Sequence, residues 1–414
     1  MTEIQSQADI TIVGGGMVGA AMAALLAHAN AGWQVVLVEG FPLPGPGEAI
    51  HQPSFDDRST ALAYGSIELL QRIGVWDQLS QAATPIQQVH VSDRGHFGGS
   101  LIDASAMGLE QVGAVVANAW LGRVLLQHLH ELDNVELLAP ATVERVTPLA
   151  QGAHIDYASA DASGRIESQL VVIADGADSP LRAGLGIGVD TQTYHQTAII
   201  ANVALNERHD CVAYERFTDQ GPMALLPLGG ENGCDSALVW TQPTDQVDAL
   251  LALDDDAFMA QLQQRFGFRL GHFKSVGKRD SYPLQLLVAK EQVRSSLVMM
   301  GNAAHFLHPV AGQGFNLALR DCAALTSVLA RARRQRQPLG SLQVLQQYEQ
   351  QQQLDQQATI QFSDKLTRLF STGALPSAGL RALGFLGLET LPGAKQLLAS
   401  QTMGQASRRP VFHR

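Results

Sequence analysis

The sequence predicts a mixed α/β fold that is interrupted by an antiparallel β-sheet and followed by a helical C-terminal segment. The chain opens with a β-rich run, a glycine turn, a helical run and a second β-rich run. Residues 86–102 and 197–243 alternate apolar and polar side chains, as antiparallel strands do. Residues 336–414 carry apolar side chains at helical spacing. Because 414 residues exceed what one compact core usually holds, we expect two or three domains.

The first element is a βαβ unit. Asp9–Val13 is short, apolar and rich in β-branched residues, which predicts a strand. Small and apolar residues over 17–29 predict a helix, and Trp33–Glu39 predicts the next strand. Strand, helix and strand in this order predict a Rossmann-like domain built on a parallel sheet.

The turn inside this unit carries Gly14, Gly16 and Gly19 in the pattern GxGxxG, and Glu39 ends the second strand. After a strand and before a helix, this pattern is the dinucleotide-binding fingerprint. The first glycine permits the tight turn, the second lets a pyrophosphate touch the backbone, and the third lets the helix pack on the strand. Glu39 would accept hydrogen bonds from the adenosine ribose. The alternative is a glycine-rich turn with an exposed Glu.

The middle of the chain predicts antiparallel β-structure. Residues 86–102 predict a hairpin that turns at Asp93 and Arg94. The stretch 197–243 contains four strand-like runs, and Asp254–Phe266 predicts a capped helix beside them. We therefore expect the two β stretches to form one second layer.

The region 336–414 predicts helices. Its glutamine-rich part is compatible with a solvated helix or a flexible segment, and we favour the helix because Leu342, Leu345 and Tyr348 share one face. A second apolar stripe at 362–370 suits membrane contact, core packing or oligomerisation equally well.

Charge and cysteine content exclude several classes of protein. Lys plus Arg is 28 and Asp plus Glu is 39, so the formal charge is −11 and nucleic acid is not an expected partner. Cys211, Cys234 and Cys322 form no CxxC pair, so neither a disulfide framework nor a zinc site is expected. The N-terminal residues do not resemble a signal peptide, and no apolar run of about 18 residues predicts a membrane span. We expect a cytoplasmic protein, with peripheral contact at the inner membrane left open.

A second motif, MMGNAAHFLHPVAGQGFN, covers residues 299–316 and is rich in small residues. A short strand ends there, and a helix is predicted to start at about Gly314. A second helix N-terminus with bare backbone N–H groups suits a group that gains negative charge. A reduced flavin does so at its N1–C2=O edge, whereas a nicotinamide does not. The alternative is a buried joint between strand, turn and helix.

A third motif, VVIADGADSPLR at 171–182, makes the resemblance to a family specific. The three motifs, in their order along the chain (14–19, 171–182 and 299–316), resemble those of the single-component FAD-dependent aromatic hydroxylases of the para-hydroxybenzoate hydroxylase type. The stretches DDRSTALA (56–63), ERFTDQGPMALLPL (215–228) and RDSYPL (279–284) resemble the ubiquinone-biosynthesis branch of that family. The resemblance extends to about residue 370.

The resemblance implies FAD as the bound cofactor. The positions that match the family's FAD contacts are Gly14, Gly16, Gly19, Glu39, Arg58, Arg123, Asp175, Gly176, Asn302, Gly314, Phe315 and Asn316. By resemblance, Arg58 and Arg123 lie near the phosphates and ribityl chain, although surface ion pairs are the alternative. Asp175 and Gly176 are implied in binding both FAD and NAD(P)H, unless Asp175 only forms a turn.

Asn302 departs from the family pattern, because the wider family carries Asp there to accept a hydrogen bond from a ribityl hydroxyl. Asn keeps an acceptor oxygen and loses the charge. His305 and His308 have no carboxylate or Cys at ligand spacing, so packing or backbone hydrogen bonding is favoured over a metal site or catalysis, and no metal is expected.

The implied reaction is hydroxylation of a polyprenyl-methoxyphenol. NAD(P)H binds transiently and reduces the FAD, and O2 then forms a C4a-hydroperoxyflavin that transfers OH to the ring. By resemblance, the backbone at Pro309 and Gly312 flanks the peroxide, and Phe217, Leu226 and Pro227 line the substrate. Ordinary sheet core is the alternative for Phe217 and Leu226.

Several alternatives stay open for the function and the partners. They are hydroxylation at another ring position, another aromatic substrate, and a low-turnover flavin-bound scaffold subunit of a biosynthetic complex. The oligomeric state is also open. For the domains, we expect an FAD-binding domain at 1–85, 103–190 and 280–335, a β-sheet substrate domain at 86–102 and 191–279, and a helical region at 336–414.

Overall fold

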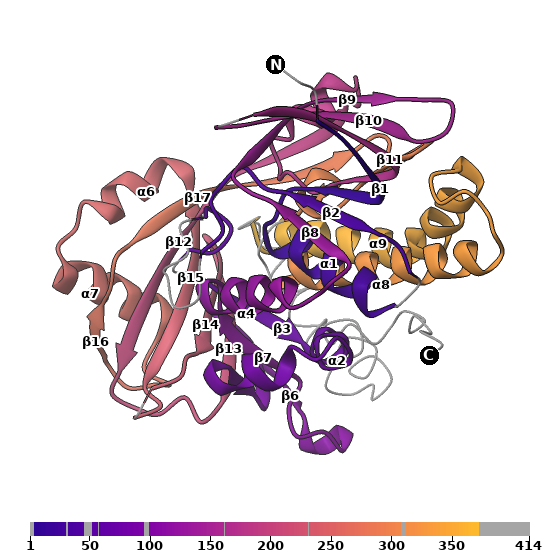
Figure 1. Cartoon of the computed structure of the whole chain (residues 1–414). Coiled ribbons are helices and arrows are strands. Elements are labelled where there is room, and N and C mark those ends of the chain that lie inside the picture. Colours follow the sequence, from indigo (N-terminus) through magenta and orange to yellow (C-terminus); the bar gives the residue numbers. More distant parts are fainter. Residues whose placement is uncertain are drawn as a thin grey trace.

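The computed structural model describes residues 4–29, 32–44, 52–56, 58–94, 99–160, 162–230, 232–307 and 312–371. Within these residues the strands form three sheets, and the longest helices lie beneath the first of them (Figure 1). No helix of the described part is long and apolar enough to cross a membrane. The mixed α/β fold class that the sequence predicts is confirmed.

The first sheet has eight strands in the described part of the chain. They are β1 (Ile4–Val13), β2 (Val35–Val38), β8 (Val135–Leu138), β9 (Ala141–Pro148), β10 (Ala153–Ser159), β11 (Ser163–Ile173), β18 (Val293–Arg294) and β19 (Leu297–Met299). Parallel pairing joins β19, β11, β1, β2 and β8 in that order. Every residue of β2 is buried, as expected for a parallel strand covered on both faces.

The second sheet has nine strands among the described residues. They are β5 (Gln88–Asp93), β6 (Gly99–Asp103), β12 (Val189–Leu205), β13 (Val212–Thr218), β14 (Gly221–Pro227), β15 (Asp235–Pro243), β16 (Phe273–Val276), β17 (Asp280–Ala289) and β20 (His305–Phe306). The predicted hairpin is the antiparallel pair β5–β6. Because β5 pairs in parallel with β13, the two β stretches form one layer, as expected.

A third, three-stranded sheet and the helices complete the described fold. The small sheet consists of β3 (Ser59–Ala63), β4 (Thr84–Ile86) and β7 (Gly113–Ala117). The α-helices are α1 (Met17–His28), α2 (Tyr64–Arg72), α3 (Trp76–Leu79), α4 (Asn118–His130), α5 (Pro180–Gly184), α6 (Thr244–Leu251), α7 (Asp255–Phe266), α8 (Gln313–Arg334) and α9 (Leu342–Ser371). Short 3-10 turns are η1 (Ser80–Ala82), η2 (Ser105–Met107) and η3 (Gly301–Ala303).

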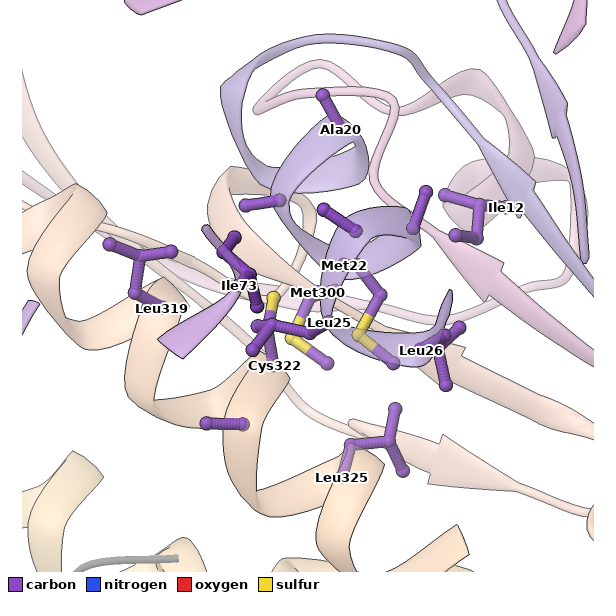
Figure 2. Close-up of a cluster of buried hydrophobic side chains, with 14 of the residues drawn as sticks. Ile12, Ala20, Met22, Leu25, Leu26, Ile73, Met300, Leu319, Cys322 and Leu325 are labelled. Atoms are coloured by element: carbon purple, nitrogen blue, oxygen red, sulfur yellow. The ribbon is translucent and has the colours of Figure 1, made fainter. Parts of the chain in front are cut away.

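The largest core lies where α1 and α8 pack against each other beneath the first sheet. Small residues fill α1, so its neighbours can approach closely on several sides. Figure 2 shows Met22, Met300 and Cys322 meeting between the two helices. Cys322 is fully buried and is a core residue, and burial raises the pKa of its thiol well above the usual value.

The nine-stranded sheet has two different faces. On one face, Trp240 packs against Phe258 of α7, and α6 and α7 cover this side (Figure 1). On the other face, Ala213 and Leu226 pack against residues of the small sheet, including Val115. We call this second face the inner face, because it is turned towards the small sheet and α2.

The expected helices are present. Asp254 caps α7 by accepting a hydrogen bond from the Ala257 amide at 2.8 Å, as an N-cap residue does. In α9, Leu345 and Tyr348 are buried as predicted, but Leu342 is 42% exposed because it lies at the first residue of the helix. Most side chains of the stripe at 362–370, and all residues from 372 to 414, lie outside the described part.

Candidate functional site

Three motifs that are far apart in the sequence begin at one edge of the first sheet. Val13, Ile173 and Met299 are register neighbours and each is the last residue of its parallel strand. The chain then continues into the glycine turn, the DG turn at 175–176 and the turn that η3 forms. Ligands of open α/β sheets bind outside the carboxyl ends of the strands, so this edge is the expected place for a cofactor.

Direct contacts hold the three turns together. A Cβ atom on Gly14, whose φ is +102°, would lie 2.5 Å from the Ala174 carbonyl oxygen, so the glycine turn and the DG turn touch through bare backbone. A Cβ atom on Gly301 would lie 2.8 Å from Val18 of α1. The Arg182 guanidinium donates to the Ala303 carbonyl at 2.9 Å, which ties the DG motif to η3.

The glycine turn has the geometry that the fingerprint predicts. A Cβ atom on Gly19 would lie 1.8 Å from the Gly14 carbonyl oxygen, so only glycine lets α1 start so close to β1. The Glu39 carboxylate is buried and accepts hydrogen bonds from the Gly15 amide at 2.5 Å and the Phe41 amide at 2.8 Å. Glu39 therefore lies directly against the turn, at the positive N-terminal end of α1.

The N-terminus of α8 supplies a second site of bare amides. Gly312 caps the helix in the left-handed conformation, with φ of +59°. A Cβ atom on Gly314 would meet no described atom within 4 Å, so the backbone there is uncovered. Because the first N–H groups of a helix have no partner in the helix, this end can bind an electron-rich group.

One segment of the chain reaches both turns. Ser54 Oγ lies 2.7 Å from where a Cβ atom on Gly16 would be, and Ala61 Cβ lies 3.3 Å from the corresponding position on Gly312. Ala61 is seven positions after Ser54, and an extended chain spans at most ~3.6 Å per residue, so the Cα atoms of the two residues that touch the turns lie at most about 25 Å apart. That is the scale of one extended dinucleotide.

Buried polar groups at this edge lack protein partners. Both carboxylate oxygens of Asp175 are buried and accept no hydrogen bond of ordinary geometry among the described residues, although the Ser179 hydroxyl and the Leu181 amide lie close enough to favour its charged form. The amide atoms of Gln52 are also buried without a partner among these residues. Burial is the main cause that raises the pKa of Asp175. A buried polar group without a partner is costly, so these groups fit a bound polar ligand that would satisfy them. The residues present therefore fit a dinucleotide such as FAD.

Four other predicted site residues have different surroundings. Arg58 donates to Asp56 at 2.5 Å, and its guanidinium lies 4.6 Å from the ring centre of Tyr282. Arg123 is exposed on α4, and Asn302 is exposed in η3. Phe315 is 9% exposed and packs into the core beneath the first sheet, so little of its side chain is left to meet a ligand.

The side chain of Asn316 is fully occupied by protein contacts. Its oxygen accepts from the Ala63 amide at 2.8 Å and from Ser66 Oγ at 2.7 Å. Its nitrogen donates to the carbonyls of Ala61 at 2.8 Å and Gly312 at 2.7 Å. Asn316 therefore fastens the start of α8 to β3 and α2, and only its backbone is left for a ligand.

The predicted substrate residues do not share one face. Strand alternation places Phe217 and Leu226 on the inner face of the nine-stranded sheet and Pro227 on the opposite face. Phe217 is 3% exposed, whereas Leu226 is half-buried. Pro309, predicted to flank the reacting oxygen, and His308 lie outside the described residues; Gly312 lies at the start of α8.

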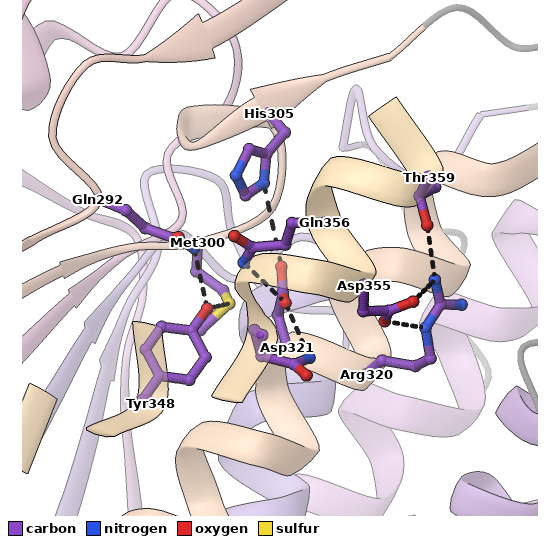
Figure 3. Close-up of polar contacts among 10 residues, drawn as sticks. Gln292, Met300, His305, Arg320, Asp321, Tyr348, Asp355, Gln356 and Thr359 are labelled. Carbon is purple, nitrogen blue, oxygen red and sulfur yellow. Dashed lines mark hydrogen bonds and ion pairs between the residues drawn. The ribbon is translucent and has the colours of Figure 1, made fainter. Parts of the chain in front are cut away.

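A buried polar network of α8 and α9 lies beside His305 of the second motif (Figure 3). Asp321 of α8 is fully buried, and its Oδ1 accepts from Gln352 at 3.0 Å and Gln356 at 2.9 Å. Its Oδ2 has no hydrogen-bond partner among the described residues and lies 3.9 Å from His305 Nδ1. Burial raises the pKa of Asp321 to about 7 and lowers the pKa of His305 to about 4, so both are neutral between these values.

A second buried pair in Figure 3 ties α8 to α9. Arg320 donates to Asp355 at 2.6 Å, and its second nitrogen donates to Thr359 at 3.2 Å. Nearer the start of α9, the Tyr348 hydroxyl accepts a hydrogen bond from the Gln292 amide nitrogen at 2.9 Å. Sequence reasoning did not find this network, because residues such as Gln352 and Gln356 look like any others in a glutamine-rich helix.

Comparison with known proteins agrees with this geometry. A family model described as an FAD binding domain matches residues 7–363. The chain is 38% identical over 402 residues to ubiquinone hydroxylase UbiL of Rhodospirillum rubrum, covering 96% of this chain and 90% of that protein. It is 31% identical over 401 residues to 3-demethoxyubiquinol 3-hydroxylase of Escherichia coli, covering 96% of this chain and 98% of that protein.

A solved structure shows the same fold. The crystal structure of p-nitrophenol 4-monooxygenase PnpA from Pseudomonas putida matches with a TM-score of 0.76 at 18% identity. The match covers 99% of this chain and all of that one, so the described sheets and helices follow an architecture already seen by experiment.

Proposed function

The chain belongs to the family of flavoprotein monooxygenases that is defined by this FAD-binding domain, and from that premise we propose that it hydroxylates the ring of a polyprenylated phenol in ubiquinone biosynthesis. It is an FAD-dependent enzyme that uses NAD(P)H and O2. The observation that carries the proposal is the convergence of three separate motifs at the carboxyl edge of β1, β11 and β19. The substrate class is inferred from the relatives named above.

FAD supplies the oxygen chemistry: when bound and reduced, it activates O2 for transfer of one oxygen atom to an electron-rich ring. The chain's own residues bind and orient. We propose that Gly14, Gly16, Gly19 and Glu39 hold the ADP part of FAD. We propose that the buried Asp175 carboxyl makes a hydrogen bond to the part of FAD that connects the phosphates to the ring system. The bare amides at Gly314 would hold the ring system.

The direct test is the dependence of NAD(P)H oxidation on the phenol. We expect the purified protein to be yellow, and a prenylated 2-methoxyphenol to accelerate its NAD(P)H oxidation with formation of a hydroxylated product. The matched control is the same compound with its ring hydroxyl methylated, which keeps the tail and removes the phenol. A protein that cannot be reconstituted with FAD would contradict the proposal.

Which ring carbon is hydroxylated needs a different experiment. By resemblance, we propose an enzyme similar to 2-octaprenyl-6-methoxyphenol hydroxylase, whereas the name of the Escherichia coli relative gives 3-demethoxyubiquinol as the compound that is hydroxylated. Mass spectrometry of the quinone precursors that accumulate after deletion of the gene identifies the step. Accumulation of the prenylated methoxyphenol is the expected result. Accumulation of a later precursor would show that the enzyme hydroxylates that precursor instead.

We also propose that the substrate is collected at a membrane surface or from a partner of a biosynthetic complex. The transfer of a polyprenyl tail out of water is favourable by on the order of 0.8 kcal/mol of free energy per CH₂, so such a molecule has a very low concentration in free solution. Peripheral contact at the inner membrane by a cytoplasmic protein would meet this need.

For the domains, the predicted boundaries stand as our proposal with one refinement. We propose that β17 belongs to the substrate domain, although it lies in the range 280–335, because it pairs with β12 along ten residues of the nine-stranded sheet. The remaining ranges, 1–85, 103–190, 86–102, 191–279 and 336–414, are unchanged.

A further inference from the structure

Glu215 lies in the centre of β13, on the inner face of the nine-stranded sheet. Its register partners are Val91 of β5 and Ala224 of β14. The neighbours of Glu215 in the strand point the other way: Tyr214 contacts Phe266 of α7 through its ring. Because side chains alternate along a strand, Glu215 points towards the side of the small sheet and α2.

The surroundings of Glu215 are apolar and still accessible. Val91, Ala224 and Glu215 are all half-buried, whereas Leu225 and Met223 on the opposite face are fully buried. Residues of the inner face nearer the small sheet, such as Ala213, are also fully buried. Along β13 the inner-face neighbours on either side of Glu215, Ala213 and Phe217, are buried, so the accessible part of this face is limited to Glu215 and its two cross-strand partners.

No protein group serves as a partner of the Glu215 carboxyl. Among the described residues, no hydrogen bond or ion pair reaches it, and burial alone raises its pKa to about 8. Several charged and titratable groups lie on the inner face or opposite it, and in the described part of the chain none of them makes a hydrogen bond or ion pair with Glu215. They are Tyr64, Asp93, Asp280, Tyr282 and Arg58, of which Arg58 is paired with Asp56.

We propose that Glu215 is a catalytic residue that exchanges a proton with the ring hydroxyl of the phenol substrate. The inference rests on the proposed function and names the group that activates the substrate. A carboxyl placed without a partner on an apolar, open face is suited to bind one polar atom of an otherwise apolar molecule. A prenylated methoxyphenol is such a molecule.

The step is a proton transfer that balances within the site. The phenol O–H bond breaks, a carboxyl O–H bond forms on Glu215, and the electron pair left on oxygen is shared with the ring. The ring carbon is then a better nucleophile for the oxygen atom that O2 supplies. When the hydroxylated ring carbon then releases its own proton to water and aromaticity returns, Glu215 gives the stored proton back to the phenolate oxygen and is again a carboxylate.

The acid–base properties of Glu215 suit this role. A phenol has a pKa of about 10, and an ordinary Glu at about 4.3 would be too weak a base to take its proton. With a pKa of about 8, the carboxylate is a stronger base and is still present in part near neutral pH. Since the carboxylate is the active form, hydroxylation should increase as pH rises through 8.

The test compares Glu215→Gln with Tyr214→Phe, a control that removes a polar group from the opposite face of the same strand. We expect Glu215→Gln to keep its FAD and its uncoupled NAD(P)H oxidation, and to lose hydroxylation by about 10²–10⁴-fold. The wild-type and Tyr214→Phe rates should rise through an ionisation near pH 8, and the Glu215→Gln rate should not. Glu215→Asp, which keeps the carboxyl, should restore part of the rate.

An infrared titration of the resting protein gives a readout without turnover. The carboxyl C=O band of Glu215, identified by its loss in Glu215→Gln or its shift in Glu215→Asp, should disappear near pH 8. A Glu215→Gln variant with the wild-type rate and pH profile, or a band that titrates near pH 4, would overturn this inference and leave the proposed function intact. A wild-type protein that hydroxylates no prenylated phenol would instead overturn the proposed function, and the inference with it.

Discussion

Gly14 and Gly314 are both glycines of the candidate site, but for different physical reasons. Gly14 has φ of +102°, and a Cβ atom there would collide with the Ala174 carbonyl, so the fold itself requires glycine. Gly314 lies in the first turn of α8, and a Cβ atom there would meet no described atom within 4 Å. At Gly314, then, the protein does not require glycine, and a ligand remains as the reason.

Replacement of Gly314 by Ala separates these two roles. We expect Gly314→Ala to fold with a free energy of unfolding equal to the wild type or up to about 1 kcal/mol higher, because Ala is the better helix former. We expect the same variant to bind FAD at least about tenfold more weakly, because the new methyl group enters the space assigned to the ring. Isothermal titration of the apoprotein with FAD measures this.

Gly184→Ala is the matched control. Gly184 is also helical and open, and no described atom lies within 4 Å of its Cβ position. This variant should bind FAD like the wild type. Unchanged FAD affinity in Gly314→Ala would show that the ring is not bound at the start of α8.

Asp321 gives a stability effect with a defined sign. Its pKa is about 7 in the folded protein, against 3.8 as the ordinary value, so between these pH values the folded state holds one more proton than the unfolded state. Stability therefore falls by about 1.4 kcal/mol per pH unit as pH rises through this window, and the loss is complete above pH 7.

Asn at position 321 does not titrate and resembles the protonated carboxyl in shape. The stability of Asp321→Asn relative to the wild type should therefore rise by about 1.4 kcal/mol per unit between pH 4 and 7, and stay constant above pH 7. Urea unfolding at pH 5, 6, 7 and 8 measures the difference, with the exposed Asp178→Asn as control. A difference that is independent of pH would mean that Asp321 ionises normally in the folded protein.

Several site residues were predictable one by one, and others were not. The spacing of Gly14, Gly16 and Gly19 predicts the turn that the structure shows, because backbone geometry demands glycine there. The environment of Asp321 was not predictable, since burial and its partners on α9 depend on how two helices pack. The position of Glu215 was not predictable either, because a single Glu in a strand-like stretch does not tell which face of the sheet it occupies.

At the scale of elements, Asn316 fixes where α8 begins. Its amide makes four hydrogen bonds, to β3, to α2 and to the cap residue Gly312. The side chain is 1% exposed, so water cannot replace these bonds if they are lost. The position of the α8 N-terminus relative to the small sheet therefore depends on one side chain.

Truncation of Asn316 should be costly. Asn316→Ala leaves buried donors and acceptors without partners, each worth about 1–3 kcal/mol, and we expect a total loss of about 3 kcal/mol or more in the free energy of unfolding. Asn316→Asp removes the two donated bonds and also buries a carboxyl group, so we expect this variant to be destabilised as well. Thermal unfolding of both apoproteins checks this; a melting temperature within about 1 °C of the wild type for Asn316→Ala would refute the role.

The positions of individual strands and helices in the sequence were more predictable than the pairing of the strands in the sheets. The strand and helix of the first βαβ unit, the hairpin at 86–102 and the helix at 254–266 all follow from local periodicity and capping, and the structure contains them. The parallel pairing of β5 with β13 could not be read from either stretch, because register between strands some 120 residues apart has no local signal. β12 spans 17 residues and begins at Val189, before the start of the predicted β stretch 197–243.

At the scale of the whole molecule, the fold brings one cofactor edge and one open sheet face together. The glycine turn, the DG turn and η3 meet at the end of the first sheet, and β3 with its neighbours connects this edge to the inner face of the second sheet. The sequence motifs predicted the three turns, and only the fold shows that residues 54 to 61 link two of them.

The central claim is that this chain inserts one atom of O2 into the ring of a prenylated phenol. The most direct measurement is mass spectrometry of the product made from a prenylated 2-methoxyphenol under ¹⁸O₂ with NAD(P)H. We predict one ¹⁸O atom in each product molecule, located in the new ring hydroxyl. A product without ¹⁸O, or NAD(P)H oxidation that yields only hydrogen peroxide with this substrate, would contradict the claim.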